Sequence, residues 1–130
     1  MIGDLVYECK GKIVSMRIKE NGDAEYTAMV GGMMRGEQFS STFSWDTQFR
    51  PDGSGYGQIR GFFNTANGEA GKYTGIGNGY TRPDGGQVHM GALCYSNPPG
   101  KFADLNKMAV AYEVNIDKDG NFLSKGWSWK

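Results

Sequence analysis

The residues on which most catalytic and metal centres depend are scarce in this chain, which has one histidine, two cysteines and four prolines among 130 residues. Cys9 and Cys94 match no zinc-binding spacing, and two thiols with one histidine make a poor ligand set. A Ser-His-Asp triad also lacks support, because no nucleophile-elbow sequence occurs. We therefore expect two reduced cysteines, no metal and no organic cofactor.

A net charge and a long apolar run are missing too. Fourteen basic residues balance fourteen acidic ones, and without a basic stripe we expect no nucleic-acid partner. No apolar stretch is long enough to span a membrane, and the first residues lack the apolar core of a secretory signal. These absences predict a cytoplasmic protein with no membrane partner. The length predicts one domain over residues 1–130.

Glycine, in contrast, is abundant, with 21 residues, roughly twice its average share of a globular chain. Turn sequences that contain glycine recur along the chain, and Arg-Pro-Asp-Gly occurs twice, at 50–53 and 82–85. The Asn-Gly pairs predict type I′ hairpins, in which both central residues have positive φ. Seven connections divide the chain into eight segments. The connections are Asn21-Gly22, Arg35-Gly36, Pro51-Asp52-Gly53, Asn67-Gly68, Pro83-Asp84-Gly85-Gly86, the longer stretch 97–108, and Asp119-Gly120.

The segments between these turns alternate with a period of two. In residues 37–49, for example, Phe39, Phe43 and Trp45 share one face with Ser41 and Thr47. β-Branched and aromatic residues dominate such runs, as in strands, and the one short helical candidate lies at 101–107. The predicted fold class is therefore all-β, an eight-stranded antiparallel up-and-down β-barrel. Closure into a barrel is favoured because it leaves no exposed strand edge.

Two neighbouring segments carry their glycines on a single face, which needs a reason because glycine weakens a strand. Three explanations stay open: tight coiling of the barrel wall, close approach of bulky residues such as Trp45 or Trp127 from the far wall, or space for a ligand. The glycines are Gly53, Gly55, Gly57 and Gly61 in the first segment and Gly71, Gly75, Gly77 and Gly79 in the second.

Which face of the first strand turns toward the barrel interior is undecided as well. Its apolar positions shift from Leu5 and Cys9 to Val14, Met16 and Ile18, and a bulge near Gly11 would produce this change by inserting an extra residue.

Three polar residues are candidates for a catalytic or ligand-orienting role: His89, Glu113 and Tyr95. His89 lies in an apolar strand and is either a hydrogen-bonded wall residue or an acid–base group inside the barrel. Glu113 is solvated if it faces outward, and has a raised pKa suited to proton transfer if it faces an apolar interior. The candidates for apolar ligand contacts, or else for a filled core, are Phe43, Trp45, Tyr73, Met90, Tyr112 and Trp127.

The stretch from Asp52 to Ser96, about half of the chain, resembles the allene oxide cyclase-like barrels. In those chains a Gly-x-Gly strand follows an Asp-Gly-Glu or Asn-Gly-Glu turn, and Asn67-Gly68-Glu69 and Gly75-Ile76-Gly77 hold these places here. The resemblance implies a calycin-like barrel of eight strands. That superfamily includes cyclases that fold a flexible apolar substrate inside the barrel, although no catalytic motif carries over. Lipocalin-like barrels are a rival resemblance, but their early Gly-x-Trp is missing.

Three functions follow as hypotheses. The leading one is a barrel that binds a small, largely apolar organic molecule in its interior, oriented by one or two polar groups. The second is a cyclase or isomerase without cofactor, which gains mainly from positioning its substrate. The third is a structural or interaction module with a filled barrel and a functional outer face. A homo-dimer or homo-trimer is compatible with all three, because apolar residues occur on both faces of several strands.

Overall fold

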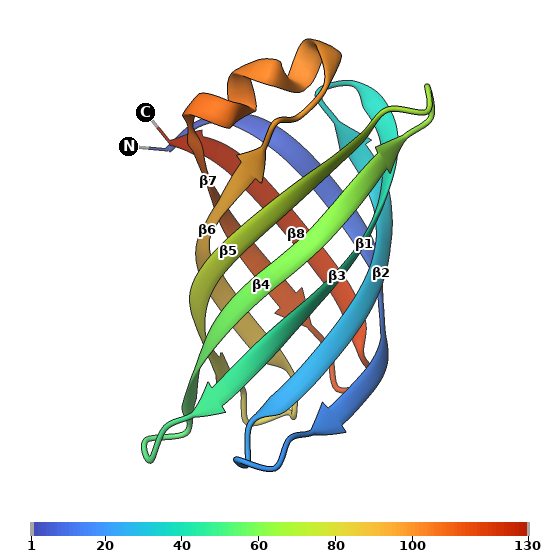
Figure 1. Cartoon of the computed structure of the whole chain (residues 1–130). Helices are drawn as coiled ribbons and strands as arrows, with labels where there is room; N and C mark the ends of the chain where they lie inside the picture. Colours follow the sequence, from blue (N-terminus) through green and yellow to red (C-terminus); the bar gives the residue numbers. More distant parts are fainter. Residues whose placement is uncertain (1, 130) are drawn as a thin grey trace.

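The computed structural model describes residues 2–129, and these form a closed barrel of eight antiparallel strands (Figure 1). Each strand pairs with the next along the chain, and the last pairs with the first. The predicted up-and-down β-barrel and the short helical turn are both confirmed. The elements are β1 (Ile2–Ile18), β2 (Ala24–Met34), β3 (Glu37–Phe49), β4 (Ser54–Thr65), β5 (Ala70–Thr81), β6 (Gln87–Ser96), the 3-10 helix η1 (Gly100–Lys107), β7 (Ala109–Ile116) and β8 (Asn121–Trp129).

Five of the hairpins share one turn geometry, whether their sequence is Asn-Gly, Pro-Asp-Gly or Asp-Gly. In each, the glycine amide donates to the carbonyl three residues earlier, as Gly53 does to Arg50 at 3.0 Å, and only the glycine has positive φ. This is the pattern of a type I turn followed by a glycine bulge. The type I′ predictions for Asn21-Gly22 and Asn67-Gly68 are therefore wrong. Asn21 instead accepts a hydrogen bond from the Asp23 amide through its side chain.

The turn between β2 and β3 is the exception. There Arg35 and Gly36 have φ values of 49° and 81°, the two positive angles that a type I′ turn requires. Its sequence signal was the weakest of the series, because arginine is seldom chosen for a left-handed position.

A bulge in β1 is present, at Val14 rather than at the predicted position near Gly11. The pairing of β1 with β2 shifts between Ile13 and Ser15, so Val14 is the extra residue. Beyond it, Met16 and Ile18 pair with Tyr26 and Ala24 and therefore share the face of β2 that turns toward the barrel interior.

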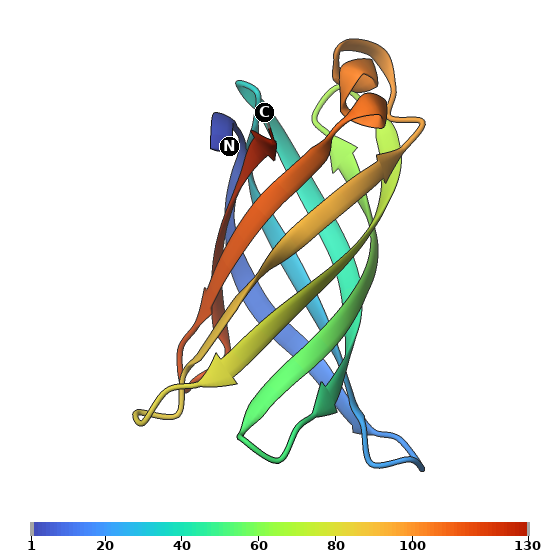
Figure 2. The ribbon, with the colours of Figure 1, turned by 90° about the vertical axis from the view of Figure 1, so that its left-hand side faces the viewer.

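The two ends of the barrel differ. At one end, called the helix end here, η1 lies across the opening (Figures 1 and 2), with Phe102 and Leu105 fully buried beneath it. The ion pair between Lys101 and Glu37, at 2.9 Å, and that between Arg35 and Asp104 tie η1 to the β2–β3 hairpin. The other end, the hairpin end, carries the turns 19–23, 50–54, 82–86 and 117–121 and no helix. No helix between Ile2 and Trp129 combines the length and hydropathy needed to cross a membrane.

The strand glycines of β4 and β5 face the interior, where rings from adjacent strands cover them. A Cβ on Gly61 would lie 2.7 Å from the Tyr73 ring, and one on Gly71 would lie 2.5 Å from the Phe63 ring. At Gly32 and Gly91 the nearest atom would be a backbone carbonyl oxygen of the neighbouring strand, at 2.0 Å. Coiling and close approach therefore both contribute. The alternative in which Trp45 or Trp127 approaches from the far wall is wrong, since the rings come from the next strand, or at Gly77 from Tyr112 two strands away.

Candidate functional site

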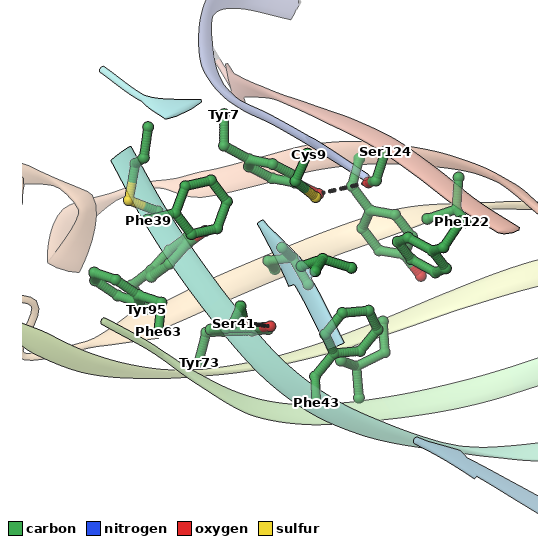
Figure 3. A pocket seen from close by; sticks show the side chains of 16 residues that line it. Tyr7, Cys9, Phe39, Ser41, Phe43, Phe63, Tyr73, Tyr95, Phe122 and Ser124 are labelled. Carbon is green, nitrogen blue, oxygen red and sulfur yellow. Dashed lines mark hydrogen bonds between the residues drawn. The ribbon is translucent and has the colours of Figure 1, made fainter. Parts of the chain in front are cut away.

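The barrel interior is lined by rings and encloses two small cavities. The larger, about 50 Å³, lies toward the helix end, and Figure 3 shows the side chains around it. The smaller, about 30 Å³, lies toward the hairpin end and touches Trp45 and His89. Five residues line both cavities and so lie between them: Phe43, Ile59, Tyr112, Val114 and Phe122. The ring centres of Phe43 and Phe122 are 5.2 Å apart.

The size of the cavities limits what they can hold. A cavity needs about 10–15 Å³ to admit one water molecule, whereas pockets for drug-sized ligands occupy about 300–1,000 Å³. The interior of this barrel is therefore mostly filled by its own side chains, and a ligand larger than a few water molecules requires ring movement.

The polar groups around the helix-end cavity satisfy one another. Ser41 donates to the Phe62 carbonyl at 2.7 Å and so accepts the bond of 2.6 Å from the Tyr73 hydroxyl. Ser124 likewise donates to a backbone carbonyl, that of Glu113, and accepts from Tyr7 at 3.0 Å (Figure 3). Burial raises the pKa of both tyrosines, so their hydroxyls stay protonated at neutral pH.

Cys9 shares this cavity and is equally unreactive. The thiol is buried, and burial raises its pKa to about 12. A thiol rather than a thiolate therefore faces the cavity, and the helix-end cavity offers an apolar lining without an ionised group.

The polar groups at the hairpin end are less well satisfied. The indole nitrogen of Trp45 and the hydroxyl of Thr47 are buried and have no hydrogen-bond partner. The Trp45 ring is held between Tyr26, at 5.2 Å and nearly parallel, and Phe43, at 5.6 Å. The indole ring, which lines the smaller cavity, therefore cannot turn away easily.

His89 stands against the edge of Trp45, with ring centres 6.2 Å apart. Its Nε2 donates to the Gln87 side-chain oxygen at 2.9 Å, which leaves Nδ1 as an acceptor. Burial lowers the pKa of this histidine, so the imidazole is neutral near pH 7. Trp45, whose N–H has no partner, and the neutral His89 thus line one small chamber.

Part of the rim at the hairpin end is apolar. Met16, Ile18 and Phe49 occupy inward-facing positions of β1 and β3, yet they are 54%, 64% and 57% exposed because the strands run past the filled interior. An apolar rim of this kind suits the passage of an apolar molecule better than that of an ion.

Four of the six predicted contact residues line the interior: Phe43, Trp45, Tyr73 and Tyr112. The other two do not. Met90 is 51% exposed on the outer wall, and Trp127 lies on the outward face of β8, opposite in parity to the buried Ser124 and Ser128. Their expected role in an interior site is corrected accordingly, because inward positions on β8 are even-numbered and those on β6 are odd-numbered.

The three predicted catalytic residues do not form one site. Glu113 is exposed on the outer wall, paired with Met90 and Lys125, which removes it from the interior. His89 and Tyr95 both face inward on β6, but they are six residues apart, or roughly 20 Å at about 3.4 Å per residue. Tyr95 packs at the helix end, with its ring centre 5.8 Å from that of Phe63.

The alternation of β3 also signals residues that the prediction left out of the site. Thr47 and Ser41 share the face of Trp45 in that strand, and both turn out to be buried polar groups of the interior. Phe122 and Ser124 in β8 are interior by the same rule. Throughout residues 2–129, no three His, Cys, Asp or Glu side chains gather closely enough to hold a metal ion.

Comparisons with known proteins support the fold and do not indicate a function. No family of known proteins matches the chain, and no curated protein matches it either. A crystal structure of a conserved protein of unknown function from Rhodopseudomonas palustris superimposes with a TM-score of 0.78, covering 97% of this chain and 95% of that one at 8% sequence identity. The two proteins share a barrel fold, and at this identity the likeness says nothing further.

Proposed function

We propose that the barrel binds a small, compact, largely apolar molecule that carries one hydrogen-bond acceptor, at the hairpin end. The observation that carries this proposal is the buried indole N–H of Trp45, which has no partner in an otherwise aromatic chamber. A buried donor without an acceptor costs about 1–3 kcal/mol. A ligand that supplies the acceptor would offset this cost.

Access and size narrow the ligand class. The rim of Met16, Ile18 and Phe49 offers an apolar route to the chamber. A single flat ring requires local movement of the lining side chains, whereas a long flexible chain must also displace the five residues between the two cavities, so a flat ring is favoured. A planar ligand would also stack on the rings already present.

The test compares two probes of similar size, benzonitrile, which has an acceptor nitrogen, and toluene, which has none. In proton–nitrogen NMR spectra, benzonitrile should move the indole N–H signal of Trp45 downfield as the hydrogen bond forms, whereas toluene should bind more weakly and leave that signal nearly in place. The chain has three tryptophans, so Trp→Phe variants assign the three indole signals.

Trp45→Phe keeps a ring but removes the donor, and it should abolish the preference for benzonitrile over toluene. Trp127→Phe is the matched control, because Trp127 lies on the outer wall, and it should leave the preference intact. The proposal fails if neither probe perturbs residues around the hairpin-end cavity at millimolar concentration, or if the preference survives in Trp45→Phe.

We keep membership of the allene oxide cyclase-like superfamily, and with it a cyclase or isomerase activity, as the second proposal. With Glu113 outside the barrel, His89 is the acid–base candidate beside the hairpin-end cavity, and its neutral imidazole would act as a base. The small interior gives this proposal less support, because a flexible substrate needs more space than the two cavities provide.

A further inference from the structure

The outer wall of the barrel has two unlike sides. Over β2, β3 and β4 it carries a charged network, in which Arg60 bonds Glu25 at 2.7 Å and Asp46 at 3.4 Å, and Lys19 and Arg17 extend it. The exposed apolar residues on this side, Met29, Met33 and Phe62, each pair with polar or charged residues on both neighbouring strands. Over β5 to β8 and the start of β1 the outward residues are mainly apolar. A barrel wall that meets only water is expected to be polar on all sides, so the second side needs another explanation.

The apolar side consists of two adjacent rows without a charged residue. In the first row each residue pairs directly with the next across five strands: Ile76, Ala92, Ala111, Trp127 and Leu5. In the second row Thr74 pairs with Cys94, Cys94 with Ala109, and Trp129 with Ile2. We call these two rows together the apolar face.

The apolar face contains both a groove and a ridge. The groove holds about 320 Å³ and has a floor of small side chains, Ala92, Ala109 and Ala111. Its sides include Met90 and Trp129, which are 51% and 61% exposed. The ridge continues from Trp129 through Trp127 to Ile2 and Leu5, the last two being 50% and 48% exposed.

We infer that two copies of this chain pair through the apolar face about a twofold axis, with Trp129 of each copy seated in the alanine groove of the other. A twofold interface must be self-complementary, so each copy must present both the projecting and the receiving surface. Here the ridge and the groove lie side by side on one face, as such an interface requires.

Charge and area agree with a second copy as the occupant. The paired residues of the two rows include no charged side chain, and Asp4 is the exposed charge nearest to them in sequence, between Ile2 and Leu5. The row beside them alternates in sign, with Glu113 paired to Lys125 and Lys125 to Glu8. The large apolar side chains of the face expose on the order of 600 Å², near the ~800 Å² per partner of a stable interface. An apolar centre with a polar rim is the usual anatomy of such contacts.

The first measurement is the mass of the chain in solution at about 100 μM, by sedimentation or light scattering. The expected mass is twice the 14.3 kDa of one chain. Ala111→Arg places a charge on the groove floor and should give a single-chain mass with an unchanged far-ultraviolet spectrum. Thr42→Arg, at an outward position of β3 on the polar side, is the matched control and should remain paired.

Cys94 provides a second readout, because it lies exposed on the apolar face whereas Cys9 is buried. In the paired protein Cys94 should react with a maleimide at least about tenfold more slowly than in Ala111→Arg. If Ala111→Arg does not fold, Trp129→Glu, at a more exposed position, replaces it. This variant should likewise give a single-chain mass and a freely reactive Cys94.

Three results would overturn the inference. One is a single-chain mass for the natural sequence with freely reactive Cys94. Another is a mass other than that of two chains, which would exclude a closed twofold pair. The third is a pair that persists in both Ala111→Arg and Trp129→Glu. None of these results bears on the interior ligand, so the two proposals fail separately.

Discussion

Gly61 and Tyr73 show how an eight-stranded barrel can hold so many rings. The two residues are directly paired across β4 and β5, and the ring lies flat over the bare glycine where a side chain would otherwise stand. Tyr7 lies over Gly126 in the same way. Each ring covers backbone that glycine leaves exposed, which offsets the low strand preference of glycine.

Gly31 and Gly32 allow a direct test of this account, because they are neighbours in β2 with opposite faces. A Cβ on Gly32 would lie 2.0 Å from the Glu8 carbonyl oxygen, whereas one on Gly31 would lie 3.6 Å from its nearest neighbour. Gly32→Ala should lower the free energy of unfolding in urea by about 1–3 kcal/mol through overpacking. Gly31→Ala should change it by less than about 0.5 kcal/mol. Equal effects of the two substitutions would contradict the packing argument.

His89 links stability to pH. Burial lowers its pKa in the folded chain, so the unfolded chain binds the proton more tightly. The stabilisation from neutral His89 is complete above the unfolded pKa of about 6.5 and is lost as the pH falls through the folded pKa. The free energy of unfolding should therefore decrease as the pH drops below about 7. The slope against pH should correspond to the uptake of at most one proton on unfolding.

His89→Gln should remove this slope, because the chain has no second histidine. Urea titrations at several pH values would measure it in both proteins. A slope that persists in the variant would assign the effect to another group. The contribution of the carboxylates can be told apart from that of His89 because they titrate at lower pH. Hydrogen bonds and charge from Lys101 lower the pKa of Glu37, and a hydrogen bond from Ser54 lowers the pKa of Asp52.

The helix η1 acts as a plug at its end of the barrel rather than as an independent helix. Eight residues of 3-10 helix are too short to be stable alone, and η1 is held by Phe102 and Leu105 beneath it and by the ion pairs of Lys101 and Asp104. The Phe102 ring meets Phe63 edge-on with ring centres 5.9 Å apart, which continues the aromatic packing of the interior.

Phe102→Ala should therefore destabilise the protein by about 3–5 kcal/mol, the usual effect of removing a fully buried ring. Phe62→Ala is the control, since Phe62 is 48% exposed on the outer wall of β4, and its effect should be at most about 1 kcal/mol. Denaturant titration measures both, and amide hydrogen exchange shows whether η1 detaches before the barrel opens. Similar losses for the two variants would show that η1 does not plug the barrel.

The barrel as a whole is asymmetric in two directions. Along its axis, one end is plugged by η1 and the other has an apolar rim around Trp45 and His89, so the proposed ligand has one route in. Around its axis, a charged side over β2 to β4 faces away from the apolar face over β5 to β8 and β1. The first asymmetry supports the interior binding proposal, and the second supports pairing of two chains.

Most of the fold could be predicted because it depends on local patterns. Glycine turns at short intervals and a period of two, as in residues 37–49, specify strands and hairpins from neighbouring residues alone. The turn type at Asn21-Gly22 was mispredicted because the choice between a type I′ turn and a glycine bulge depends on how many residues the paired strands leave for the loop.

The candidate site was less predictable because parity fixes which residues share a face but not which face is inside. The strands of Glu113, Met90 and Trp127 were predicted correctly, but these three side chains point outward. A bulge such as the one at Val14 changes the assignment within a single strand. The fit of each ring over a glycine next door, and hence the small size of the cavities, depends on strand register.

The amino-acid sequence was therefore sufficient for the number of strands, their order, the positions of the turns and the short helical segment, since each depends on residues near in the chain. Barrel closure through β1 and β8 decided the remainder. It set which face of each strand is buried and brought Trp127 and Trp129 beside Leu5 and Ile2 from the opposite end of the chain. These outcomes join residues more than a hundred positions apart, which no local pattern encodes.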